Sequence, residues 1–491
     1  MPWKRNAFAQ ALLAAGVLLG IVAVGFVALA LTRRPDNPVE AELVYEALRA
    51  ASGRSLYVDP SLGAWEDGGP PSRFYVLYTP VWPWLVGHLA GPNVEAIRVV
   101  GRCIATAAWL AIFIVPVAAA SRVRRRTVAT AALLGLGLYF LARNAPSATP
   151  DTLAVAFACA GLVRAAKRGH VDAISAALLA VAPLVKPSCL GVLAGAAIAH
   201  VASREPGRFR AVLGGAAAAL ALALFCQVAS DGAWLTHIVR STGQPLTLTR
   251  FFEQLGSRIV ILGIPHLVVA IIAIRRRAPL VVTAPLVVSI VWSSFSMAKH
   301  GSGTQYWIEP TMAAIVAIAF MPARRATFQL RAAGAVVAAL VTVTSVPAYS
   351  HELEEWQVRK AELALVDHYC TRQAGDVVVS SEAAIELALD GRVIVPDWQS
   401  SFLARRGMFP AEAWRNDLRD PHARWLVLAF DPAEPAADTN DARIEISAFR
   451  DVLRPVVDEA FVRDARIGPF VVFRRRDASE LLSRAASAAP R

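Results

Sequence analysis

The stretch from Asp36 to Pro80 gathers acidic and aromatic side chains directly after a long apolar N-terminal segment. Within it, Glu40 and Glu42 are two residues apart, so their side chains diverge by about 200° on a helix and share a face in an extended segment. A carboxylate beside a membrane can serve as a general base for an acceptor hydroxyl. The alternative is an ordinary acidic helix start, because Asp and Glu are favoured in the first turn.

Two further charged residues stand where apolar runs begin and end. Asp151 follows Pro150 at the start of a run. It is either a residue of the kind favoured in the first turn of a helix or a second site carboxylate that lies close to the acids of the first loop. Lys186 ends another run, on the side where the positive-inside rule predicts few cations. It either snorkels to the interface or holds an anionic leaving group as a point charge.

A later loop adds candidates for binding an anion. The segment from Lys299 to Pro310 combines Lys299, His300, two glycines and Tyr306 between two apolar runs. Flexible backbone amides beside a cation can form a phosphate-binding nest, and a tight connector with interfacial aromatics explains the same residues equally well. Arg143, in an earlier loop, is a further candidate for the same anion.

The composition is that of a polytopic membrane protein. Of the 491 residues, 56% are hydrophobic and 18% are charged, and long apolar runs recur from Phe8 to Pro347. The formal net charge of +12 comes from short Arg and Lys clusters between these runs. That placement indicates membrane topology and not nucleic-acid binding. The five cysteines form neither a disulfide framework nor a CxxC metal site.

The basic clusters and the apolar runs together predict the topology. A span needs about 20 apolar residues, and basic clusters mark the inner side of the membrane. After a first span over Ala7–Leu31, the segment Phe74–Ala90 must stay at the interface, because a crossing there would place Arg122–Arg126 outside. Pro80 and Pro83 also interrupt it. We expect about eleven crossings, the others at approximately 97–120, 127–143, 152–166, 172–186, 189–202, 211–229, 259–274, 279–298, 308–322 and 332–347.

The composition changes after Ser350. We therefore predict a membrane bundle over residues 1–347, with a first outer loop at 33–96, and a small soluble α/β domain over 348–491 on the outer face. An amphipathic helix at Glu352–His368 and a second helical pattern at Ile444–Val457 belong to this domain. Its expected strands are Asp376–Ser380, Arg392–Pro396, Trp425–Phe430 and Phe470–Phe473. It contains no phosphate loop, zinc spacing or nucleophile elbow, so a packing or partner role is favoured.

Several of these segments resemble one enzyme family. They are the acidic loop with Glu40, "ALRAASGRSLY" ending in Tyr57, "YVLYTPVW" with Tyr78, "TPDTLAVAFACAGL" with Asp151, "LLAVAPLVKPS" with Lys186, and "KHGSGTQYWIEP". Together they resemble the polyprenyl-phosphate-dependent GT-C glycosyltransferases, in particular the bacterial group similar to protein O-mannosyltransferase and lipid A aminoarabinose transferase. Val39 stands where that family has the aspartate of a "DE" pair, so the base stays open between Glu40 and Glu42.

The resemblance implies both an activity and a set of site residues. A first-loop acid would be the base, a second acid would line the site, and Lys186 with nearby cations would hold the lipid phosphate. The catalytic candidates are Glu40, Glu42 and Asp151, and the substrate-binding candidates are Lys186, Lys299, His300, Tyr57, Tyr78, Tyr306 and Arg143.

The implied reaction is sugar transfer from a polyprenyl-phosphate donor to a lipid, glycan or protein acceptor, on the outer face of the bacterial cytoplasmic membrane. No cofactor is indicated, and a divalent metal between the carboxylates and the phosphate is left open. A lipid or polymer transporter is the alternative, although paired broken helices in two corresponding halves are missing from the sequence. A non-catalytic scaffold is a further alternative if Glu40 and Asp151 lie far apart.

Overall fold

The structure of the protein is a computed structural model, in which a defined set of residues is described. The described residues are 31, 38–63, 71–125, 127–132, 135, 147–203, 208–242, 248–254, 259–299, 304–322, 351, 353–434 and 441–477. The predicted span at 332–347, nearly all of Ala7–Leu31 and most of 127–143 lie outside them. So do the candidate residues Arg143 and His300.

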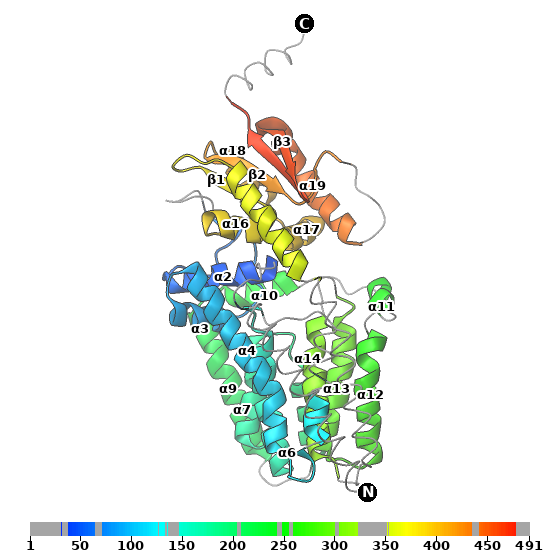
Figure 1. Cartoon of the computed structure of the whole chain (residues 1–491). Helices are drawn as coiled ribbons and strands as arrows, with labels where there is room; N and C mark the ends of the chain where they lie inside the picture. The colour runs from blue at the N-terminus through cyan, green and yellow to red at the C-terminus, as the bar shows by residue number, and fades with distance from the viewer. Residues whose placement is uncertain are drawn as a thin grey trace.

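Long apolar helices form a bundle in the lower part of Figure 1. They coincide with the predicted spans, and two of them begin with the expected capping side chains, since Asn93 accepts from Ala96 N and Asp172 from Ser175 N. The bundle helices are α4 (Val94–Ala119), α6 (Asp151–Arg168), α7 (Ala173–Val185), α8 (Gly191–Ala202), α9 (Arg208–Val228), α12 (Val260–Arg275), α13 (Leu280–Ser296) and α14 (Ile308–Phe320).

Close packing in the bundle depends on small residues. A Cβ on Gly195 of α8 would lie 2.4 Å from the Pro285 Cα of α13, so only glycine allows these two helices to approach so closely. Outward-facing side chains are apolar instead of polar, and examples on α9 are Phe209, Leu220 and Leu224. This is the reverse of a soluble bundle, and it is the pattern expected of helices that face lipid.

Helix lengths give a second indication of a membrane environment. Within the described part of the chain, α4 and the apolar part of α9, Phe209–Val228, are long and apolar enough to span a membrane, and the α9 segment is only 11% buried. The shorter apolar helices include α7, α8 and α13. Thirteen residues, as in α7, extend about 20 Å, which is shorter than the hydrocarbon core of about 30 Å.

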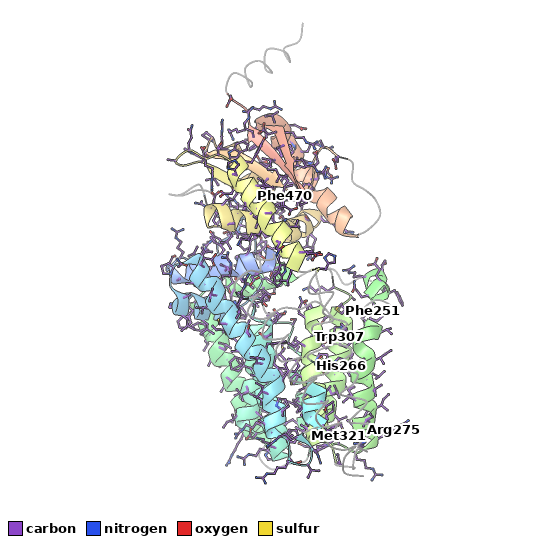
Figure 2. The ribbon with its side chains drawn as sticks, in the orientation of Figure 1. Phe251, His266, Arg275, Trp307, Met321 and Phe470 are labelled. Atoms are coloured by element: carbon purple, nitrogen blue, oxygen red, sulfur yellow. The ribbon has the colours of Figure 1, made fainter. Side chains whose placement is uncertain are left out.

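The two ends of the bundle differ in charge. Arg124 donates to Ala319 O at 3.1 Å and Arg276 contacts Met321 Sδ at 3.8 Å, which places both arginines at the C-terminal end of α14. Figure 2 shows Arg275 and Met321 at the same lower end, far from the strands. Arg124 and Arg276, from two basic clusters between apolar runs, therefore share one end of the bundle, as expected if both clusters lie on the inner side of the membrane.

Short helices and an extended segment cover the other end. α2 (Pro38–Ala51) packs against α3 (Val81–Ala90), and α10 (Trp234–Thr242) and α11 (Leu248–Gln254) follow α9 in the chain. α3 has ten residues and reaches about 15 Å, which is too short to cross a membrane. Its contact with α2 is close, because a Cβ on Gly87 would lie 2.3 Å from Ala47 O.

Residues 353–434 and 441–477, called the C-terminal unit below, lie above these short helices (Figure 1). Residues 353–369 are helical, as predicted. The four strands form one sheet of order β1-β2-β4-β3, in which β1 is parallel to β2 and the other pairs are antiparallel. Its elements are β1 (Val377–Ser380), α16 (Ala383–Asp390), α17 (Asp397–Arg405), α18 (Ala411–Arg419), β2 (Ala423–Leu428), α19 (Asp441–Ala460), β3 (Phe461–Ile467) and β4 (Phe470–Arg475).

One predicted strand is wrong. Arg392–Pro396 is a buried connection and not a strand. The amides of Ile394 and Val395 donate to the Glu386 carboxylate, which stands where a neighbouring strand would otherwise be. β3 was not predicted, because the charged residues Arg463, Asp464 and Arg466 break any apolar alternation along it, and it pairs only at the edge of the sheet.

An apolar core joins the C-terminal unit to the first loop. Leu43 and Ala47 of α2 belong to the same buried cluster as Ala383, Ala384 and Leu387 of α16. Separate clusters fill the helix bundle and the two faces of the sheet. The first loop therefore packs between the bundle and the C-terminal unit.

The charge asymmetry predicts the orientation of the chain in the membrane. A reporter fused after Arg126 should be cytoplasmic and one fused after Ser350 should be outside, because the arginine clusters resist translocation. Reporter activity of both fusions in intact cells measures this. An outside signal from the Arg126 fusion would mean that Phe74–Ala90 crosses the membrane.

Candidate active site

A buried ion pair lies where α6 begins and α7 ends. Lys186 caps the C-terminus of α7, and its Nζ contacts Asp151 Oδ1 in the first turn of α6. Both residues are at least nine-tenths buried. The tyrosine rings of Tyr78 and Tyr306 lie 5.9 and 5.2 Å from this ammonium, within reach of cation–π attraction. The lysine is thus placed by one carboxylate and two aromatic rings.

A cleft of about 290 Å³ opens beside Lys186. One part of its wall is cationic, since Lys186 and Lys299 both line it. Burial, and then the nearby Lys186 charge, lower the pKa of Lys299 to about 8. The remainder of its lining is aromatic, aliphatic or small and polar: Leu77, Tyr78, Pro187, Ser188, Leu190, Trp292, Phe295, Ser296 and Tyr306.

The polar and apolar parts of this cleft suit different parts of one ligand. Two ammonium groups attract an anion, and Trp292, Phe295 and Leu190 offer a surface for a hydrocarbon chain. Leu190 and Phe295 are also exposed at the outside of the bundle. An apolar tail could thus run from the cleft into the surrounding lipid.

Tyr78 is the aromatic residue that joins the cleft to the first loop. Burial, and then its charged and polar neighbours, raise the pKa of Tyr78 well above its usual value; those neighbours are Asp151, Tyr306, Glu42 and Glu46. Its backbone carbonyl accepts from the Tyr57 hydroxyl at 2.9 Å. Tyr57 therefore positions Tyr78 and does not line the cleft.

The acidic residues of α2 occupy two faces of the helix. Arg102 Nε of α4 lies 2.9 Å from Glu40 Oε1, which also accepts from the Ala148 amide at 2.7 Å. Glu42 and Glu46 are four residues apart, so they share the face toward Tyr78. The predicted 200° divergence of Glu40 and Glu42 is what the helix produces.

Glu46 is a buried acid that the sequence-based argument missed. It is 2% exposed, and burial raises its pKa to about 8, although the charge of Arg49 acts in the opposite direction. Its spacing from Glu42 is the signal that could have identified it, because both lie on one face of a helix directly before the aromatic loop.

Most of the predicted residues that are described gather around the cleft. Asp151, Lys186, Lys299, Tyr78 and Tyr306 come together directly. The other acids are close by. The charge of Glu42 contributes to the raised pKa of Tyr78, and the Glu40 carboxylate accepts a hydrogen bond from the amide of Ala148, three residues before Asp151. Two buried partners were not foreseen: Arg102, and Glu309, whose Oε1 accepts from the Val192 amide at 2.7 Å.

Within the described residues, no three His, Cys, Asp or Glu side chains come together as a metal site. The carboxylates nearest the cleft are held by nitrogen partners instead, as Asp151 is by Lys186.

Comparison with known proteins identifies the fold. No protein-family model and no curated protein sequence matches this chain. Among solved structures, ArnT from Cupriavidus metallidurans in the apo state aligns over 97% of this chain and 99% of its own, with a TM-score of 0.60 and 14% identity. The chain has the GT-C fold.

A second structure of the same protein gives a consistent result. ArnT from Cupriavidus metallidurans bound to undecaprenyl phosphate aligns over 94% of this chain and 98% of its own, with a TM-score of 0.58 and 14% identity. ArnT is the lipid A aminoarabinose transferase and a GT-C protein. The expected mainly helical GT-C architecture is therefore confirmed as a fold, and at 14% identity the likeness extends no further than that.

The two lysines of the cleft predict a pH dependence. Binding of a long-chain alkyl phosphate to the purified protein should weaken as pH rises through about 8, because Lys299 loses its charge there. Lys299→Arg should bind equally at pH 7 and pH 9.5, because a guanidinium stays charged. Titration of the lipid at several pH values measures this, and pH-independent binding by the unmodified protein would remove Lys299 from the anion site.

Proposed function

We propose that this protein is a membrane glycosyltransferase that moves a sugar from a polyprenyl-phosphate donor to an acceptor hydroxyl. The observation that carries the proposal is the buried Lys186–Asp151 pair at a cleft with a second lysine and an apolar wall. A donor of this class combines an anionic phosphate with a long hydrocarbon chain, and the cleft offers a partner for each. The shared fold with ArnT supports the same class of reaction.

The proposed reaction is a single displacement at the anomeric carbon. The acceptor oxygen forms a bond to this carbon while the bond to the phosphate oxygen breaks, so the configuration inverts. The acceptor proton passes to a carboxylate, and the electron pair of the broken bond stays on the departing polyprenyl phosphate. Lys186 and Lys299 stabilise that negative charge.

Of the three candidate bases, we favour Asp151. A donor phosphate would compete with its carboxylate for Lys186, and the carboxylate released in this way lies beside the reacting atoms. Glu42 is the second candidate, because its charge, like that of Asp151, interacts with Tyr78 beside the cleft. Glu40 is already engaged by Arg102 and by the Ala148 amide, which makes it a poorer proton acceptor.

The cleft lies at the end of the bundle that carries the C-terminal unit, away from the arginine clusters. We therefore place the reaction on the outer face of the bacterial cytoplasmic membrane, with the C-terminal unit also outside. The donor then arrives on its lipid, and no nucleotide-binding motif is needed. The acceptor is a lipid, a glycan or a protein.

A transfer assay tests the proposed function directly. Purified protein in detergent is incubated with a set of polyprenyl-phosphate sugars, and release of polyprenyl phosphate is measured. Cells that lack the protein should accumulate one of these lipid-linked sugars, which names the donor. Lys186→Ala should lower turnover far more than Lys186→Arg, because only the first change deletes the charge. Equal turnover by Lys186→Ala and the unmodified protein would remove this lysine from the site.

Conservative amides separate the three carboxylates. Asp151→Asn should lower kcat by roughly 10²-fold or more, because it loses proton acceptance, and Glu42→Gln should do less. Glu40→Gln should mainly lower the melting temperature, because it weakens the partner of a buried arginine. Thermal melting of each variant is the control. Full stability with lost turnover in Glu40→Gln, beside an active Asp151→Asn, would assign the base to Glu40, as the family resemblance implies.

A further inference from the structure

The extended segment from Ser72 to Thr79 connects the cleft with the C-terminal unit. Its last residues belong to the cleft, since Tyr78 lies beside Lys186 and the Thr79 hydroxyl donates to Leu184 O near the end of α7. Its first residues contact the C-terminal unit, where Ser72 Oγ donates to Val393 O at 3.1 Å. One short piece of chain therefore touches both.

Gln399 of α17 binds this segment as a neighbouring strand would. Its Oε1 accepts from the Tyr75 amide at 2.6 Å, and its Nε2 donates to the Tyr75 carbonyl at 2.7 Å. The side chain is fully buried. A buried backbone group that loses such a partner is costly, so this amide fixes the backbone three residues before Tyr78.

A buried ion pair fixes the same segment two residues earlier. Arg73 Nε and Nη2 donate to the two carboxylate oxygens of Asp417 in α18 at 2.7 and 2.9 Å, in a bidentate arrangement. The Arg73 amide also donates to Ile394 O at 2.8 Å. Both partners are nearly inaccessible, at 2% and 4% exposure of their side chains.

α10, one of the short helices that cover the bundle, also binds the segment from Ser72 to Thr79. The Val76 amide donates to His237 Nδ1 at 3.0 Å, and Arg240 donates to the Tyr75 hydroxyl at 2.6 Å. Burial lowers the pKa of His237 to about 4, so its ring is neutral and able to accept this hydrogen bond at physiological pH. α10 and α17 thus both form hydrogen bonds with the extended segment, at Tyr75 and Val76.

We propose that Gln399 and Asp417 are positioning residues for the cleft. They hold the segment from Ser72 to Thr79 so that the Tyr78 ring stands beside Lys186, and the C-terminal unit thereby completes the anion site. α16 adds to this effect, because it packs on α2, the helix that carries Glu42. The inference rests on the proposed function, since the reaction gives the cleft its substrate.

The test compares two variants of α17. Gln399→Ala removes both hydrogen bonds to Tyr75, and Arg405→Ala removes an exposed side chain at the end of the same helix. Gln399→Ala should weaken binding of undecaprenyl phosphate and raise KM for the donor by about tenfold. The effect on kcat should be smaller, because the change displaces the segment from Ser72 to Thr79 already in the free protein, before the donor binds. Arg405→Ala should match the unmodified protein in both measurements.

Asp417 needs a variant that keeps the protein folded. Asp417→Asn retains shape but loses the charge that pairs with Arg73, and it should raise KM in the same way; Asp417→Glu should restore part of the affinity. Thermal melting identifies any variant that has simply unfolded. A folded Gln399→Ala protein with unchanged lipid affinity and KM would overturn the inference. Failure of the unmodified protein to bind undecaprenyl phosphate or to transfer any sugar would instead overturn the proposed function.

Discussion

The arrangement of the cleft depends on how one buried lysine is kept charged at the edge of a membrane. An ammonium group in such a place is costly unless a counter-charge and polarisable neighbours surround it. Asp151 supplies the counter-charge to Lys186, and the rings of Tyr78 and Tyr306 supply the neighbours. These four side chains come from four separate parts of the chain. Their meeting point therefore requires α6, α7, the turn before α14 and the first loop to be in place together.

The first loop meets this requirement because partners from distant parts of the chain satisfy its extended backbone. Hydrogen bonds with Gln399, His237 and Tyr57 replace the neighbouring strands that the segment around Tyr75 and Tyr78 lacks. Backbone order of this kind is set by tertiary contacts and not by local propensity. Placement of Tyr78 thus depends on α10 on one side and on the C-terminal unit on the other.

The features that could be predicted from the sequence are those that depend on neighbouring residues in the chain. Apolar run lengths gave the described bundle helices, and the 3.6-residue period correctly separated Glu40 from Glu42. Contacts between distant residues left no local trace, so Arg102, Asp417 and Gln399 were not anticipated. The wrong strand at Arg392–Pro396 has the same origin, because its apolar residues are buried but its amides are taken by the Glu386 carboxylate.

Burial distinguishes the ion pair suited to binding a ligand from the one suited to holding helices together. Arg102 and Glu40 are sealed, with side-chain exposures of 1% and 0%, and the Ala148 amide further occupies the carboxylate. Lys186 and Asp151 retain 9% and 12% exposure and border a cleft. In the proposed reaction, an incoming anion would replace Asp151 at Lys186, at the edge of the cleft, whereas separation of Glu40 from Arg102 would break a sealed ion pair inside the fold. Glu40 thus fixes α2 against α4, and in the proposed mechanism the exchange of ionic partners is assigned to Lys186.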